Sequence, residues 1–197
     1  MAAPRLTIDS TACFIIDVQQ NILPDMHDHE RLVDRCAFVA TVAGVLGLPT
    51  VLTEQVTRVF GRTADAVSLA LPGDTARFEK SQFSGCVSPV LDWLGAQSRQ
   101  NVVVAGIEAH ICVMQTTLDL LDRGFQVFLV TDAISSGEAD QTPHALRRME
   151  QAGAILTGCV SMAYELLRDA KHPQFKACLE PVKRLRSGAA GPERPGC

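Results

Sequence analysis

This chain contains a set of short, almost uninterrupted apolar runs. Five have the length of a strand, at residues 12–18 (ACFIIDV), 49–54 (PTVLTE), 101–105 (NVVVA), 126–132 (QVFLVTD) and 154–158 (AILTG), and residues 77–80 (RFEK) are a sixth, less apolar candidate. Apolar residues fill these runs continuously and not at every second position, which is typical of strands covered on both faces of a parallel sheet. The sequence therefore predicts a buried parallel sheet.

The segments between these runs carry apolar residues at helical spacing. The predicted helices span residues 29–46, 87–97, 109–123, 142–151 and 161–170. The third has its apolar residues on one stripe, and Gly124 follows it as a C′ glycine. Strands that alternate with helices predict an α/β fold, here a three-layer αβα, Rossmann-like arrangement around a mostly parallel sheet of about six strands.

The length of the chain indicates one domain. Its 197 residues are enough for a single well-buried core and too few for two ordinary domains. We expect the domain to span residues 1–182 and the Gly- and Pro-rich residues 183–197 to form a flexible tail. Residues 55–76 lack clear periodicity, and we expect them to form a loop over the strand ends.

Charge and hydropathy argue against two classes of partner. No apolar run approaches the roughly 18 residues that span a bilayer, and the first residues lack the character of a secretory or transit peptide. We therefore expect a cytoplasmic protein without membrane contacts, and an organellar address stays open. The formal net charge of −4 offers no basic field to a polyanion, so we expect no nucleic-acid partner.

The cysteine pattern predicts free thiols and no metal. Seven cysteines, at positions 13, 36, 86, 112, 159, 178 and 197, form neither a CxxC motif nor a Cys/His pair at zinc spacing. An odd number without a signal peptide favours reduced thiols, most of them packed in the core as small hydrophobic residues. We expect no cofactor.

Three reactive side chains lie at or just after the carboxyl ends of predicted strands: Asp17, Lys80 and Cys112. In a parallel sheet the carboxyl ends of the strands meet at one edge, where ligands bind. Cys112 lies near the start of a predicted helix, where the helix dipole lowers the pKa of a thiol. Asp17 could accept the thiol proton, and Lys80 could stabilise both anions. Taken singly, these residues also fit a turn, a surface lysine and a core cysteine.

Longer motifs around these residues resemble the isochorismatase-like cysteine hydrolase superfamily, and within it the isochorismatase domain-containing proteins. The resemblance covers residues 6–176 and rests on IIDVQ (15–19), LTEQ (52–55), K-x-x-F-S (80–84), GIEAHICVMQT (106–116), TTLDLLDRGFQVFLVTDAISS (116–136) and HPQFK (172–176). It implies a catalytic triad of Asp17, Lys80 and Cys112, in which the cysteine attacks a carbonyl and water hydrolyses a thioester. It also implies a cis peptide bond between Glu108 and Ala109, and an oxyanion hole from the N–H groups of Ala109 and Cys112.

Two departures from the superfamily's motifs reduce the number of reactions that this chain is expected to catalyse. Nicotinamidases of this superfamily bind a metal through an Asp-x-His pair and a further histidine after the second strand, whereas residues 53–68 (TEQVTRVFGRTADAVS) contain no histidine. Isochorismatases proper cleave a vinyl ether without relying on this cysteine. The first hypothesis is therefore a metal-independent cysteine hydrolase that acts on a small amide or related C–N bond. The alternatives are a hydrolase-fold binding or scaffold protein with little turnover, and a thiol-based redox protein.

Four further residues have candidate roles near the predicted triad. Gln19, Glu54 and Phe83 could line the substrate pocket, although packing or capping explains each almost as well. We interpret His110, two residues before Cys112, as a turn residue that points outward or into a subunit contact. The resemblance and the aliphatic α/β core predict a homo-oligomer. We expect a small-molecule substrate.

Overall fold

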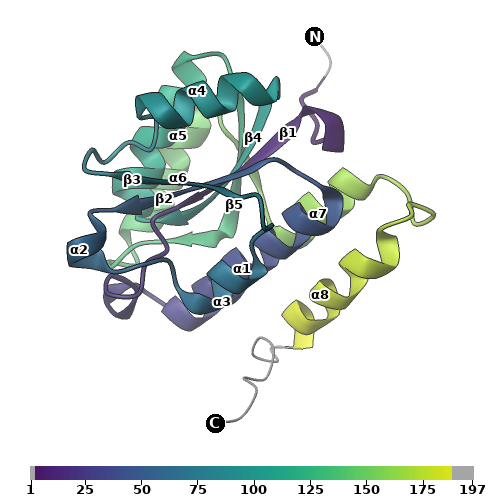
Figure 1. Ribbon diagram of the computed structural model, residues 1–197, viewed down its shortest axis with the longest axis horizontal. Helices are drawn as coiled ribbons and strands as arrows, with labels where there is room; N and C mark the ends of the chain where they lie inside the picture. The colour runs from purple at the N-terminus through teal and green to yellow at the C-terminus, as the bar shows by residue number, and fades with distance from the viewer. Residues whose placement is uncertain (1–2, 188–197) are drawn as a thin grey trace.

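A parallel sheet forms the centre of the protein, with the strand order β3-β2-β1-β4-β5-β6 (Figure 1). The computed structural model describes residues 3–187. The strands are β1 (Thr11–Ile16), β2 (Thr50–Gln55), β3 (Ala76–Lys80), β4 (Asn101–Ile107), β5 (Gln126–Ser135) and β6 (Ile155–Thr157). Every neighbouring pair is parallel. The predicted α/β fold is confirmed, and the sheet is parallel throughout.

Helices cover both faces of the sheet, which explains why the strands are continuously apolar. On one face lie α1 (His29–Leu46), α3 (Asp65–Ala70), α7 (Cys159–Leu167) and α8 (Phe175–Ser187), and on the other lie α4 (Ser88–Gln97), α5 (Met114–Asp122) and α6 (Gln141–Gln151) (Figure 1). Along β1, Cys13 and Ile15 pack into the first layer, whereas Phe14 and Ile16 pack into the second. Every residue of the central strands β1, β2 and β4 is buried, whereas the edge strand β3 exposes Arg77 and Glu79.

The predicted helices agree with the structure except in a few segments. Residues 55–76, predicted as a loop, contain the short helix α2 (Thr57–Phe60) and α3. The helix predicted at 161–170 is α7, which ends at Leu167. No helix within residues 3–187 is long and apolar enough to cross a membrane.

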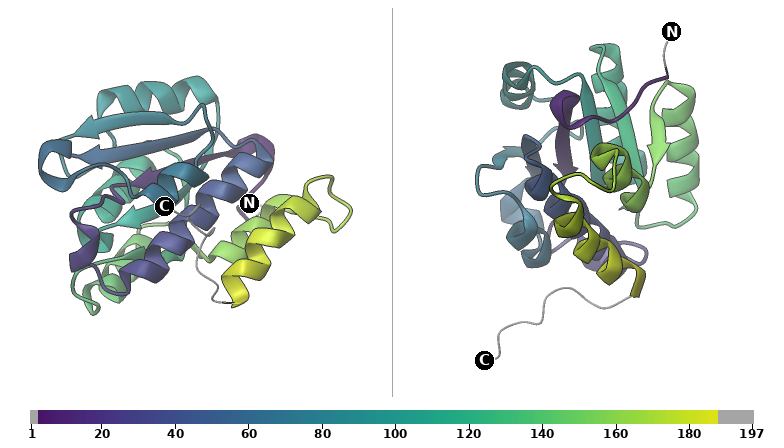
Figure 2. Two further views of the ribbon diagram at one scale, coloured as in Figure 1. Left: turned by 60° about the horizontal axis from the view of Figure 1, so that its bottom comes forward. Right: turned by 90° about the vertical axis from the view of Figure 1, so that its right-hand side faces the viewer.

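The last helix, α8, was not predicted. Two of its residues, Cys178 and Val182, are buried, and Pro181 lies inside the helix, so the sequence lacks a clear helical stripe there. The helix packs against α1 (Figure 2). The predicted boundary between domain and tail, at residues 182 and 183, falls inside α8, and residues 188–197 of the predicted tail lie outside the described residues.

Candidate active site

Asp17, Lys80 and Cys112 meet at the carboxyl edge of the sheet. Lys80 Nζ lies 2.6 Å from Asp17 Oδ2 and 3.7 Å from Cys112 Sγ. All three residues are buried, with exposed fractions of 2%, 4% and 7% respectively. The three side chains come from distant parts of the sequence, and their contacts fit the predicted triad.

The strand ends explain why these residues converge. Asp17 directly follows β1, and its N–H donates to the carbonyl of Thr53 in β2 at 3.1 Å. Lys80 is the last residue of β3 and is paired in register with Gln55. Since β1, β2 and β3 are neighbours in a parallel sheet, both side chains reach the same edge.

Cys112 lies in a single turn of π-helix, Ala109–Val113, between β4 and α5. The carbonyl of Glu108 accepts hydrogen bonds from the N–H groups of Ile111 and Val113, both at 3.1 Å. Such π turns recur at functional sites. Gly106 has φ +129°, and a Cβ there would lie 2.1 Å from the carbonyl oxygen of Ile16, so only glycine lets the strand before this turn pass so close to β1.

Lys80 contacts further hydrogen-bond acceptors besides Asp17 and Cys112. Its ammonium donates to Gln55 Oε1 at 2.6 Å and lies 3.1 Å from the carbonyl oxygens of Gln82 and Phe83. Gln55 is a site residue that was not predicted from the sequence. The available signal was its position at the end of the second apolar run, beside the lysine strand.

The surroundings of Asp17 favour its action as a base. Asp17 Oδ1 accepts a hydrogen bond from Thr53 Oγ1 at 2.8 Å, and Oδ2 faces Lys80. Burial raises the pKa of Asp17 above its ordinary value, and Lys80 and Thr53 offset only part of this rise. A carboxylate with a raised pKa takes a proton from a thiol more readily than an ordinary aspartate does.

The predicted low pKa of the Cys112 thiol is wrong. Burial raises the pKa of Cys112 to about 12, the negative charge of Asp17 adds to the rise, and Lys80 opposes both effects. The dipole of a helix end is weaker than these two effects, because the thiol is removed from water and lies beside a carboxylate. The resting site therefore holds a protonated thiol next to its base.

The labelling rate of Cys112 by iodoacetamide is expected to rise with pH from about pH 5 to about pH 9 without reaching a plateau. The thiolate fraction grows about tenfold per pH unit below the pKa, and the pKa of Cys112 is raised to about 12. Mass spectrometry with peptide mapping measures the rate. Cys13, which is 1% exposed, is the internal control and should stay unlabelled in the folded protein. A plateau below neutral pH would contradict the raised pKa.

The cis peptide bond lies between Ile107 and Glu108, one residue before the predicted Glu108–Ala109 position. That prediction is therefore wrong by one residue, because the sequence does not show that β4 ends at Ile107, where the chain turns. Ala109 and Cys112 are both buried in the following turn. Their N–H groups stay the predicted oxyanion donors.

Two of the three predicted pocket residues brace the loop after β2. Gln19 Nε2 donates to the carbonyl oxygens of Gln55 at 3.0 Å and Gly61 at 2.7 Å. Glu54 accepts from both the N–H and the hydroxyl of Thr63, at 2.7 and 2.8 Å. Burial alone would raise the pKa of Glu54, but these hydrogen bonds and the nearby Arg62 hold it below its ordinary value.

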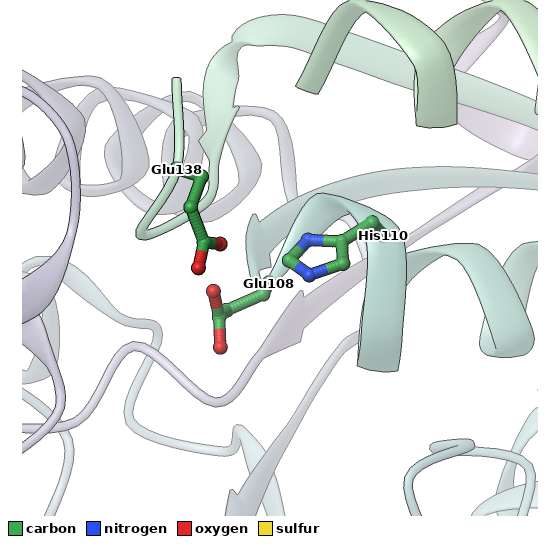
Figure 3. Close-up of side chains that lie close together, drawn as sticks. All are labelled: Glu108, His110 and Glu138. Atoms are coloured by element: carbon green, nitrogen blue, oxygen red, sulfur yellow. The ribbon is translucent and has the colours of Figure 1, made fainter. Parts of the chain in front are cut away.

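Phe83 and His110 are less buried than the two residues that brace the loop after β2. The Phe83 side chain is exposed, at 55%, so it is available to a ligand. His110 is half-buried, and its Nδ1 lies 3.1 Å from Ser136 Oγ. Its ring points toward Glu108 and Glu138 (Figure 3). The predicted outward orientation or subunit contact of His110 stays a prediction.

Comparison with known proteins agrees with this fold. Residues 11–159 match the isochorismatase domain family. Isochorismatase domain-containing protein 2A from Mus musculus is 35% identical over 188 residues, which are 93% of this chain and 90% of that protein. The solved structure of MAR1 ribonuclease from Caenorhabditis elegans has a TM-score of 0.89 at 33% identity, covering 98% of each chain.

A more distant structure shares the fold. The product of the ycaC gene of Escherichia coli, described as an octameric hydrolase of unknown specificity, has a TM-score of 0.83 at 23% identity, covering 95% of this chain and 91% of that one. The domain match spans more than half of the sequence, and the mouse relative is similar over nearly its whole length. The chain therefore belongs to the isochorismatase family.

Proposed function

We propose that this protein is a metal-independent cysteine hydrolase that acts on a small amide or a related C–N bond. The observation that carries the proposal is the position of the Lys80 ammonium between Asp17 Oδ2, at 2.6 Å, and Cys112 Sγ, at 3.7 Å. A thiol, a base and a fixed positive charge in one buried site are the groups that covalent acyl transfer requires. The nucleophile is only 7% exposed, which favours a small substrate.

The first half of the proposed reaction forms a thioester. Cys112 Sγ attacks the substrate carbonyl while Asp17 accepts the thiol proton, so a free thiolate need not accumulate. The attack builds negative charge on the substrate carbonyl oxygen, which the predicted oxyanion donors, the N–H groups of Ala109 and Cys112, would stabilise. Lys80 orients Asp17 and Cys112 during this step. The tetrahedral intermediate then collapses, the C–N bond breaks, and Asp17 returns the proton to the leaving nitrogen.

The second half releases the acid and restores the thiol. A water molecule attacks the thioester carbonyl, and Asp17 accepts a proton from that water. The C–S bond breaks, and the cysteine sulfur leaves and recovers the proton. Each step moves one proton between Asp17 and a reacting atom, which is why a raised pKa at Asp17 suits both halves.

Intact mass spectrometry during turnover of a panel of small primary and secondary amides tests this proposal. We expect a mass increase equal to the acyl group of the substrate, located on the Cys112 peptide and removed by hydroxylamine. Cys86→Ala is a matched control, since Cys86 is also nearly buried, at 9% exposed, and its variant should form the same adduct. If no member of the panel acylates Cys112, the binding or scaffold alternative replaces the hydrolase proposal.

RNA belongs in the same panel because a relative with 33% identity is named a ribonuclease. The net charge of −4 gives this chain little general attraction for a polyanion, so we propose a small molecule as the substrate. RNA cleavage by the purified wild-type chain that persists in Cys112→Ala would contradict this choice. A homo-oligomer and a cytoplasmic location stay predictions.

A further inference from the structure

A second cluster of reactive side chains lies at the same edge of the sheet, and it consists of Glu108, His110 and Glu138 (Figure 3). One donor atom from each side chain lies within 4.8 Å of the other two. Within residues 3–187 it is the only such group of histidine, cysteine and acidic residues. None of the three contributes to the contacts between Asp17, Lys80 and Cys112.

The strand register explains how this cluster forms. Ile107 at the end of β4 is paired with Ser135 at the end of β5. Glu108 and His110 follow β4, and Glu138 follows β5 after two further residues. Because the two strands are parallel neighbours, both segments leave the sheet at the same edge, where ligands bind in such folds.

The charge of the cluster favours a bound cation. In the described part of the chain, neither Glu108 nor Glu138 forms an ion pair with a lysine or arginine. Two carboxylates at this separation repel each other, and the repulsion grows where protein displaces water. Glu108 and His110 are both half-buried, so water screens the cluster only in part.

Hydrogen bonds outside the cluster orient two of its side chains for metal binding. His110 Nδ1 lies 3.1 Å from Ser136 Oγ, so an N–H at Nδ1 can donate to that buried hydroxyl and leave the Nε2 lone pair free. Glu108 Oε2 accepts a hydrogen bond from the N–H of Gly137 at 2.9 Å. Such outer hydrogen bonds hold histidine and carboxylate ligands in protein metal sites.

We propose that Glu108, His110 and Glu138 bind a divalent transition-metal ion, with Zn²⁺ as the best match to these donors. One imidazole and two carboxylates suit Zn²⁺, whereas Mg²⁺ and Ca²⁺ prefer oxygen ligands alone. Tetrahedral Zn²⁺ with bonds of about 2.0–2.2 Å spaces its donors about 3.4 Å apart. The donor atoms of the three side chains lie within 4.8 Å of one another, and the exposed Glu138 side chain can move to shorten its distances to the other two. A water molecule would fill the fourth position.

The bound ion would join the end of β4 to the end of β5, directly beside the turn that carries Cys112. This role is separate from the proposed hydrolysis, which needs no metal. The known ligand spacings in the sequence predict no metal, because Glu138 lies 28 residues after His110, and only the register of β4 and β5 brings the two residues together. The site is therefore visible only in three dimensions.

Isothermal titration of the chelator-treated 197-residue chain with ZnCl₂ and MgCl₂ tests the proposal. We expect one Zn²⁺ per chain at this site, no comparable heat with Mg²⁺, and at least about tenfold weaker Zn²⁺ binding in both His110→Ala and Glu138→Gln. The matched controls are His144→Ala and Asp140→Asn, which change exposed residues nearby that lie outside the cluster. Both controls should bind Zn²⁺ as the wild type does.

Cobalt absorption spectra separate this site from binding by cysteine. We expect Co²⁺ to give ligand-field bands without a thiolate charge-transfer band, and these bands should be lost in Glu138→Gln. Glu138 is exposed, so this variant should fold normally, and circular dichroism checks that it does. Equal Zn²⁺ affinity in all four variants and the wild type, or a thiolate band that persists in Glu138→Gln, would overturn the proposal.

Discussion

Cys112→Ala is expected to abolish turnover of the amide substrate while the chain stays folded. Alanine removes the only atom that could form the thioester, and loss of a catalytic nucleophile lowers kcat by on the order of 10⁴-fold or more. The folding cost should be small, about 1 kcal/mol, because one sulfur atom is removed from a site that is 7% exposed. Steady-state kinetics and thermal unfolding measure the two effects separately.

Asp17→Asn and Asp17→Ala should cause a comparable loss by removing the proton acceptor. In the wild type, kcat should rise as the pH rises through the pKa of Asp17, which burial raises above its ordinary value. Residual activity of the Asp17 variants should lack this acid limb. Cys159→Ala is the control and should keep full activity. Cys159 is buried away from the triad, and its N–H donates a hydrogen bond to Asp132 Oδ1. Full activity in Cys112→Ala would exclude Cys112 as the nucleophile.

Much of the fold could be predicted because local pattern and global topology agree. Both bounds of α1 were predicted correctly, since its apolar stripe is long and Gly47 ends it in a left-handed conformation. Continuous apolar runs identified the buried strands, and the rule for parallel strand ends placed Asp17, Lys80 and Cys112 on one edge. The prediction failed at α8, where a proline and few buried residues hide the helix.

The electrostatics of the site could not be predicted from sequence. A cysteine at the start of a helix suggests a lowered pKa, but the sign of the shift depends on how much water reaches the sulfur and on the distance to Asp17. Burial and that carboxylate raise the pKa of the thiol to about 12. Gln55 was missed for a similar reason, because its 2.6 Å contact with Lys80 depends on side-chain packing across two strands.

Lys80→Met is expected to lower the free energy of unfolding by about 3–5 kcal/mol near neutral pH, because it leaves the charge of Asp17 buried and unpaired. The Lys80 side chain has an exposed fraction of 0% and lies 2.6 Å from Asp17 Oδ2. Urea unfolding measures the loss. Lys183→Met is the matched control: its ion pair with Glu180 is exposed, and its loss should cost less than about 1 kcal/mol.

The pH dependence of this loss distinguishes a buried charge from lost packing. Without Lys80, the pKa of Asp17 in the folded state rises further above its unfolded value of 3.8. A group with a raised folded pKa contributes stability below its unfolded pKa and loses it as the pH rises, so the deficit of Lys80→Met should be larger at about pH 7 than at about pH 4.5.

Adding Asp17→Asn to Lys80→Met should recover most of the pH-dependent part of the lost stability. The pH-independent part of the loss in the free energy of unfolding should persist, because Gln55 Oε1 and the carbonyls of Gln82 and Phe83 still lose their donor. A deficit that is the same at both pH values would show that Asp17 is protonated in the wild type, and the aspartate would then be unable to act as the base.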